Sequence, residues 1–94
     1  GRAGLEVLAA VLYRGPLART ELDYLRGVNS SYTVRNLIMR GLIEKAPHPT
    51  NQRLMIYQPT LDLLAYLGVA RLADLPDYQT TKDQLEKLAN EPVN

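Results

Sequence analysis

Apolar residues recur along the first part of the chain with the spacing of a helix. The first such set consists of Leu5, Leu8, Ala9 and Leu12. Positions i, i+3, i+4 and i+7 lie on one face of a helix, so this spacing predicts a buried stripe on a helix over residues 4–13. Gly15-Pro16 follows directly and is expected to end that helix.

Two shorter helices are expected next, joined by only a few residues. Residues 19–26 place Leu22 and Leu25 toward the core, and residues 31–40 form the second of the two helices. The core face of the later helix consists of Val34, Leu37 and Ile38. Gly27 suits a left-handed helix end, and Asn29 or Ser30 can cap the helix that follows. Helices joined so tightly must cross steeply, which indicates a helix-turn-helix unit.

After Gly41 the period changes from that of helices to that of strands. Residues 42–46 and 53–58 suit two strands, and the turn-rich residues 47–52 connect them, which predicts a hairpin. A fourth helix is expected over residues 61–67, ended by Gly68. The predicted fold class is therefore α+β and mostly helical: a winged helix-turn-helix domain over residues 1–76 with a two-stranded wing. Residues 77–94 form a C-terminal tail whose positions 82–90 suit a short helix.

Composition narrows the functional classes. A chain of 94 residues without cysteine makes one domain, with no disulfide and no thiolate metal site. The longest apolar run, residues 7–13, is far shorter than the roughly 18 residues that cross a bilayer, so a cytoplasmic protein without a membrane partner is expected. His48 is the only histidine and stands between two prolines, where no ligand or triad spacing accompanies it. We therefore expect no enzyme, no metal and no cofactor.

Basic residues gather in the middle of the chain. Residues 19–53 contain six basic and three acidic side chains, whereas residues 61–94 contain three basic and six acidic ones. A helix-turn-helix can place its second helix in a major groove, so this region could contact DNA. The candidates for such a contact are Asn29, Ser30, Arg35, Arg40 and Arg53. The alternative interpretation is that these side chains form an ordinary solvated face.

The aromatic residues are six tyrosines, with no phenylalanine or tryptophan. Tyrosine combines a large apolar ring with a hydroxyl that can stay hydrated, which suits protein interfaces. The candidates for contact with a partner are Tyr24, Tyr32, Tyr57 and Tyr66. The alternative is that individual tyrosines lie at the edge of the core.

Several motifs resemble a known family in order and spacing. The most specific are residues 26–30 (Arg-Gly-Val-Asn-Ser), 40–43 (Arg-Gly-Leu-Ile) and 72–76 (Leu-Ala-Asp-Leu-Pro). Over about residues 5–76 the chain resembles the second winged-helix domain of the segregation and condensation protein B (ScpB) family. It departs from the family pattern at Ala18, where a capping threonine is usual, and at Ser31-Tyr32, where Asp-Gly is usual. In the wing, only Arg53 of the usual arginine, glycine and proline set remains.

The resemblance implies a role in chromosome condensation and segregation. It implies a non-catalytic subunit of the bacterial SMC complex, associated with the nucleoid, which binds the central segment of the kleisin subunit ScpA and through it SMC. It also implies a homodimer of the full-length protein, formed by a first winged-helix domain that the resemblance does not include. The alternative function is a winged-helix DNA-binding protein such as a transcription regulator.

Overall fold

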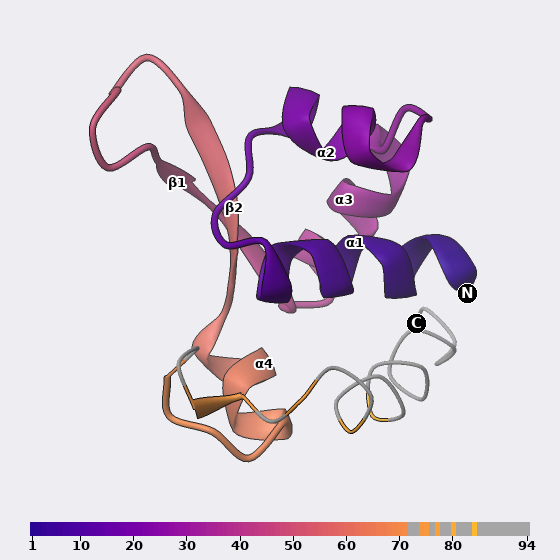
Figure 1. Ribbon diagram of the computed structural model, residues 1–94, viewed down its shortest axis with the longest axis vertical. Coiled ribbons are helices and arrows are strands. Elements are labelled where there is room, and N and C mark those ends of the chain that lie inside the picture. Colours follow the sequence, from indigo (N-terminus) through magenta and orange to yellow (C-terminus); the bar gives the residue numbers. More distant parts are fainter. Residues whose placement is uncertain (72–73, 76, 78–79, 81–83, 85–94) are drawn as a thin grey trace.

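A computed structural model describes residues 1–71, 74, 75, 77, 80 and 84 of the chain (Figure 1). Along the sequence its elements are α1 (Arg2–Tyr13), α2 (Arg19–Arg26), α3 (Ser31–Met39), β1 (Ile43–Pro47), β2 (Met55–Pro59) and α4 (Leu61–Tyr66). The strands β1 and β2 are antiparallel neighbours in one sheet. This order and pairing confirm the predicted winged helix-turn-helix.

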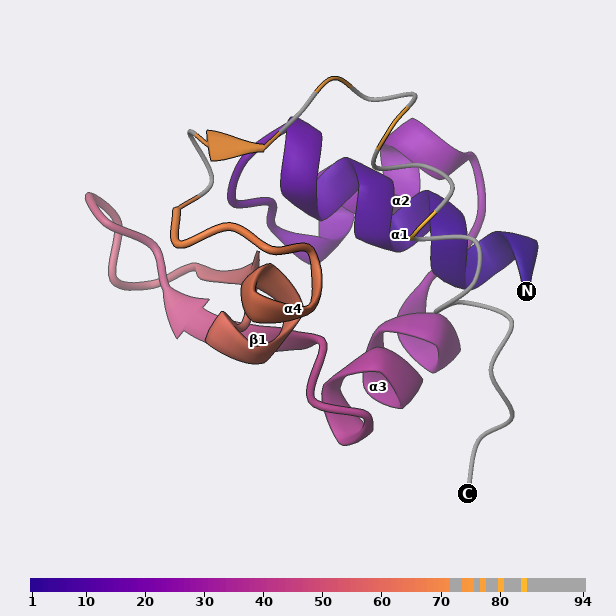
Figure 2. The ribbon, with the colours of Figure 1, turned by 90° about the horizontal axis from the view of Figure 1, so that it is seen from below.

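The helix α1 is the centre of the fold. It contacts α2, α3 and β2, and Figure 1 shows α2 and α4 on opposite sides of it. Seen from below, α3 and the sheet lie on the same side of α1 (Figure 2). Four of its residues, Val7, Leu8, Val11 and Leu12, are buried. The continuous apolar stripe of the sequence is therefore needed because α1 is covered from several directions.

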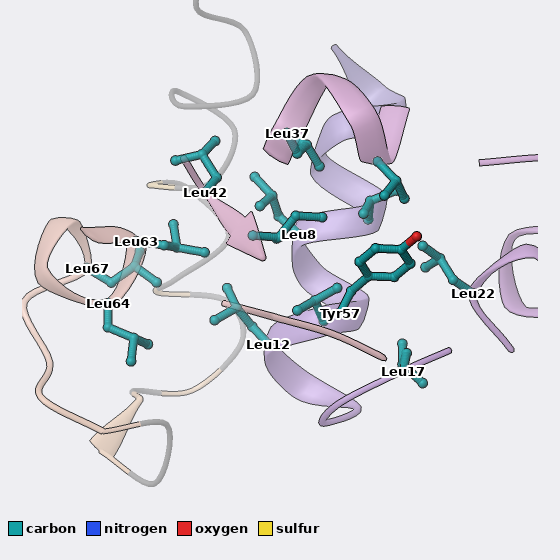
Figure 3. Close-up of a cluster of buried hydrophobic side chains, with 14 residues drawn as sticks. Leu8, Leu12, Leu17, Leu22, Leu37, Leu42, Tyr57, Leu63, Leu64 and Leu67 are labelled. Carbon is teal, nitrogen blue, oxygen red and sulfur yellow. The ribbon is translucent and has the colours of Figure 1, made fainter. Parts of the chain in front are cut away.

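The buried side chains form one cluster that joins all the elements around α1 (Figure 3). Leu22 comes from α2, Leu37 from α3, Ile43 from β1 and Leu63 from α4, and each is at most 1% exposed. Tyr57 of β2 belongs to the same cluster, although the sequence suggested it as a partner contact. A single core of this kind holds the helix-turn-helix and the wing in a fixed relation.

The wing is attached to the body by a third segment of chain. Tyr57 donates its N–H to the carbonyl of Leu17 at 2.8 Å and accepts from the N–H of Leu17 at 3.3 Å. On its other edge Tyr57 is the register partner of Lys45 in β1. The residues between α1 and α2 thus extend the hairpin and fix its position.

A hydrogen-bonded turn joins α2 to α3. Gly27 has the left-handed conformation, with φ of 73°, and its N–H bonds the carbonyl of Asp23 at 2.8 Å. The side-chain oxygen of Asn29 accepts from the N–H of Ser31 at 2.8 Å, which confirms that Asn29 caps α3. Ser30, the other capping candidate, is fully buried and makes no such bond.

The hydroxyl of Ser30 instead accepts a hydrogen bond from Arg26 at 2.8 Å. Its N–H donates to the carboxylate of Asp23, also at 2.8 Å. Arg26 continues the network by pairing with Glu6 of α1 at 3.1 Å. The turn is therefore anchored to α1 through polar groups that satisfy one another.

Some boundaries and one core assignment differ from the sequence prediction. The helix α1 begins at Arg2, α3 ends at Met39, α4 ends at Tyr66, and the strands begin one or two residues later than expected. Leu25 is 42% exposed, so its assignment to the core was wrong. It lies three residues after Leu22, which rotates it by about 60° from the buried direction on a helix of 3.6 residues per turn.

The end of the chain is described only in part. Leu75 packs against the core cluster, as the sequence suggested. Of the tail helix predicted over residues 82–90, Gln84 is described and is helical, while the remaining positions lie outside the described residues. The domain boundary at residue 76 stays a prediction.

Candidate interaction surfaces

A groove runs between α1 and α2 on the outside of the molecule. One hollow of about 480 Å³ is lined by Arg14, Leu17, Thr20, Glu21, Tyr24 and Leu25. A second, of about 320 Å³, is lined by Glu6, Ala9, Ala10, Arg14, Leu25 and Arg26. Both hollows include Arg14 and Leu25, so together they form one surface, called here the α1–α2 groove. Its lining combines leucines and alanines with charged side chains of both signs.

A smaller hollow lies between α3 and the wing. This α3–wing cleft, of about 200 Å³, is lined by Arg19, Ser31, Val34, Arg35, Ile38, Lys45 and Tyr57. Three of these side chains are cationic and none is acidic. The cleft and the α1–α2 groove share no lining residue. Within the described part of the chain, the α1–α2 groove and the α3–wing cleft thus differ in both lining and charge.

The four candidate tyrosines lie in different places. Tyr24 is 86% exposed and lines the α1–α2 groove, and Tyr32 is 79% exposed at the start of α3. Tyr66 is 44% exposed on α4, which lies on the other side of α1 from α2 (Figure 1). The structure therefore does not bring Tyr24 and Tyr66 into one patch.

Tyr57 is the one candidate tyrosine that is buried, at 8% exposure. Figure 3 shows its ring among the leucines of the core, near Leu17 and Leu22. The ring is unavailable as an anchor for a partner, which corrects the sequence interpretation. The physical reason is that β2 is paired on both edges and packs on α1, so that the alternation of the strand turns position 57 inward.

The candidate DNA contacts are also divided by the structure. Arg35 lines the α3–wing cleft, Arg53 is exposed in the wing loop, and Arg40 is the C-terminal cap of α3. Asn29 is exposed but uses its side-chain oxygen to cap α3. Ser30 is fully buried and cannot reach DNA, so that candidate was wrong. Its small polar side chain was needed inside the turn.

Two cleft residues, Arg19 and Lys45, were missed from the sequence. Arg19 is the first residue of α2 and donates a hydrogen bond to the hydroxyl of Ser31. Lys45 lies on β1 directly opposite Tyr57. Strand alternation could have placed Lys45 on the face opposite that of Glu44, but the approach of Arg19 depends on how the helices cross.

His48 has a structural role in the wing loop. Its Nδ1 accepts hydrogen bonds from the N–H groups of Thr50 and Asn51, each at 3.1 Å. The backbone N–H of His48 donates a hydrogen bond to the carbonyl of Leu54 at 3.0 Å. Among the described residues, no group of three or more histidine, cysteine or acidic side chains is placed to hold a metal ion. None of the helices described there is long and apolar enough to cross a membrane.

A family model described as "Segregation and condensation complex subunit ScpB" matches residues 1–78. The chain belongs to the ScpB family. This confirms the resemblance seen in the turn, the exit from α3 and the motif that ends at residue 76. The departures at Ala18 and in the wing therefore occur within the family fold and do not set the chain apart from it.

Curated relatives of the ScpB family agree with this assignment. Segregation and condensation protein B of Enterococcus faecalis is 36% identical over 87 residues, which cover 92% of this chain and 43% of the relative. The same protein of Oceanobacillus iheyensis is 42% identical over 76 residues, which cover 80% of this chain and 40% of the relative. This chain thus spans about two fifths of the length of the relatives that it matches.

Solved structures show the same relationship. The crystal structure of ScpB from Mycobacterium tuberculosis matches with a TM-score of 0.66 and 36% identity, over 73% of this chain and 43% of that one. The transcriptional regulator BldR from Sulfolobus solfataricus matches with a TM-score of 0.58 and 19% identity, over 94% of this chain and 72% of that one. At that identity the likeness to BldR shows the winged-helix fold alone.

Proposed function

We propose that this chain is the C-terminal winged-helix domain of a non-catalytic subunit of the bacterial SMC complex. In this role it binds the central segment of the kleisin ScpA, and through ScpA it joins SMC in chromosome condensation and segregation. The match of the ScpB family model over residues 1–78 carries the proposal. A cytoplasmic, nucleoid-associated location and a homodimer of the full-length protein belong to the same proposal.

The α1–α2 groove is the surface we propose for the kleisin segment. Its volume of about 480 Å³ in the larger hollow is in the range of binding sites that enclose several side chains. Leu17 and Leu25 give it an apolar floor, and Tyr24 stands beside them with most of its ring exposed. An amphipathic helix that places apolar side chains every three or four residues fits a groove of this kind.

The charges around the groove specify the partner further. Glu6 and Arg26 pair with each other, and Glu21 accepts a hydrogen bond from the N–H of Ala18 at 2.9 Å. Arg14 lines both hollows and has no ion pair within the described part of the chain. We therefore expect the bound kleisin segment to carry a carboxylate opposite Arg14.

Titration of this chain with a peptide of the central ScpA segment tests the proposal. Tyr24→Ala should weaken binding at least about fivefold, which corresponds to about 1 kcal/mol, because a large ring in a groove is a typical anchor. Tyr32→Ala and Tyr66→Ala are matched controls, since both rings are exposed outside the groove, and they should bind as the parent does. Calorimetry measures each affinity.

The outcomes separate the two candidate functions. Loss of binding in Tyr66→Ala, with Tyr24→Ala unchanged, would move the kleisin site to α4 and reject the groove. If the parent chain binds no kleisin peptide but binds a particular DNA sequence with high affinity, the SMC proposal is wrong. The chain would then be a DNA-binding regulator, as its fold alone would permit.

A further inference from the structure

The α3–wing cleft is lined by three cationic side chains and by no acidic one. Arg35 of α3 and Lys45 of β1 both line it, and neither has an ion pair within the described residues. Arg19 lines it too, and its pairing with Asp23 at 3.4 Å leaves the side chain 44% exposed. Like charges around one hollow raise the local potential and attract an anion.

The register of the wing explains why the cleft has a single sign. Lys45 faces Tyr57 across the sheet and so lies on the core side of the hairpin, at the edge where α3 passes. Glu44 is turned to the other face, where its carboxylate accepts a hydrogen bond from Gln58 at 2.7 Å. Alternation along β1 thus places Glu44 and Lys45 on opposite faces of the hairpin.

We propose that the α3–wing cleft binds the phosphate backbone of duplex DNA. The forked guanidinium groups of Arg19 and Arg35 match the oxygens of a phosphodiester, and the ammonium of Lys45 adds a third cation. The hydroxyl of Ser31 also lines the cleft at the start of α3. This inference does not rest on the kleisin proposal, because the two surfaces share no residue.

Duplex DNA fits these observations better than an acidic peptide. The cleft lies between the second helix of a helix-turn-helix and the wing, which are elements that can follow the groove and backbone of a duplex. Arg53 is a further exposed cation, in the loop of the same hairpin. An acidic peptide needs only a cluster of cations at one place. Here the cations lie on a helix and on the neighbouring hairpin, which suits the extended backbone of a duplex.

The binding should be independent of DNA sequence. Base readout requires polar side chains that are free to reach base edges. In the turn before α3, Ser30 is buried and Asn29 is used as a cap. The cationic groups of the cleft suit phosphates, and phosphate contacts position a protein on DNA but carry no sequence information.

Fluorescence anisotropy with a labelled duplex of about 30 base pairs tests the proposal across a salt series. For three phosphate contacts, the logarithm of the association constant should fall with the logarithm of salt concentration with a slope of about −3. In the double variant Arg35→Gln/Lys45→Gln the slope should become shallower by about 2, with at least about tenfold weaker binding at low salt. Circular dichroism verifies that the variant is folded.

Arg14→Gln is the matched control, because it removes one cation from the other surface and should leave both the slope and the affinity unchanged. Two duplexes of unrelated sequence should bind within about twofold of each other. The double variant should also retain the kleisin affinity of the parent, which separates failure of this proposal from failure of the kleisin site.

Three results would overturn the inference. The first is an unchanged salt slope in the folded double variant. The second is a preference of more than about tenfold for one duplex, which would mean that bases are read. The third is equal binding of polyglutamate of matched charge, which would make the cleft a site for an acidic polypeptide.

Discussion

At the scale of single residues, the buried hydroxyl of Ser30 shows how a polar side chain can be structural in a region that suggests DNA binding. It accepts a hydrogen bond from Arg26, while its N–H is bound by Asp23. Both partners lie on α2, and Arg26 reaches α1 through Glu6. The serine therefore holds the helix-turn-helix angle and does not face a ligand.

Ser30→Ala should lower the free energy of unfolding by about 1–2 kcal/mol, because it removes the acceptor of a part-buried, charge-assisted hydrogen bond. Urea denaturation followed by circular dichroism measures the loss. Ser31→Ala is the matched control: its hydroxyl binds Arg19 in an exposed position, so about 0.5 kcal/mol or less is expected. Equal losses in the two variants would contradict the structural role of Ser30.

At the scale of elements, α2 lacks half of its N-terminal cap. Ala18 has the extended backbone of a capping residue, and Glu21 already accepts a hydrogen bond from the N–H of Ala18 at 2.9 Å. A hydroxyl at position 18 is the missing acceptor for the N–H of Glu21 in a capping box. This is also the position where the sequence departs from the threonine that is usual in ScpB-like chains.

Ala18→Thr should therefore raise the free energy of unfolding by about 1 kcal/mol. Ala18→Val has nearly the same shape without the hydroxyl and should give no such gain. Thermal and urea denaturation of the two variants measure the difference. If valine stabilises the chain as much as threonine does, the effect comes from packing and not from a completed cap.

Sequence alone predicted the elements well where local chemistry decides them. The end of α2 at Arg26 follows from the glycine at position 27, and the wing was found from the change of period after Gly41. The strand ends were less accurate because pairing sets them: Ile43 pairs with Pro59, and Pro47 with Met55. Pairing partners far apart in the chain leave no local signal.

The candidate sites were less predictable for the same reason. Tyr57 belongs to the core and forms a bridge with Leu17. That bridge depends on the path that the chain takes between α1 and α2. The α3–wing cleft exists because Arg19, Arg35 and Lys45 come from three different elements. Residue types could suggest binding, but only the crossing of the helices decides which side chains share a surface.

At the scale of the whole molecule, the two proposed surfaces should work at the same time. The α1–α2 groove is lined from α1, α2 and the segment between them, whereas the cleft needs α3 and the wing as well as Arg19. The shared core holds both surfaces in one fixed arrangement. Binding at one surface is therefore not expected to change the affinity of the other. Free energies of binding at independent sites are expected to add.

We therefore expect a ternary complex. With the chain saturated by the central ScpA peptide, its affinity for duplex DNA should stay within about twofold of the value without peptide, because the two surfaces share no lining residue and salt at about 0.15 M weakens the interaction between exposed charges. Anisotropy of labelled DNA, measured with and without unlabelled peptide, gives both constants. The Tyr24→Ala variant at the same peptide concentration controls for direct contact between peptide and DNA. A tenfold loss of DNA affinity that requires Tyr24 would mean that the bound kleisin segment reaches the cleft, so that the two partners compete.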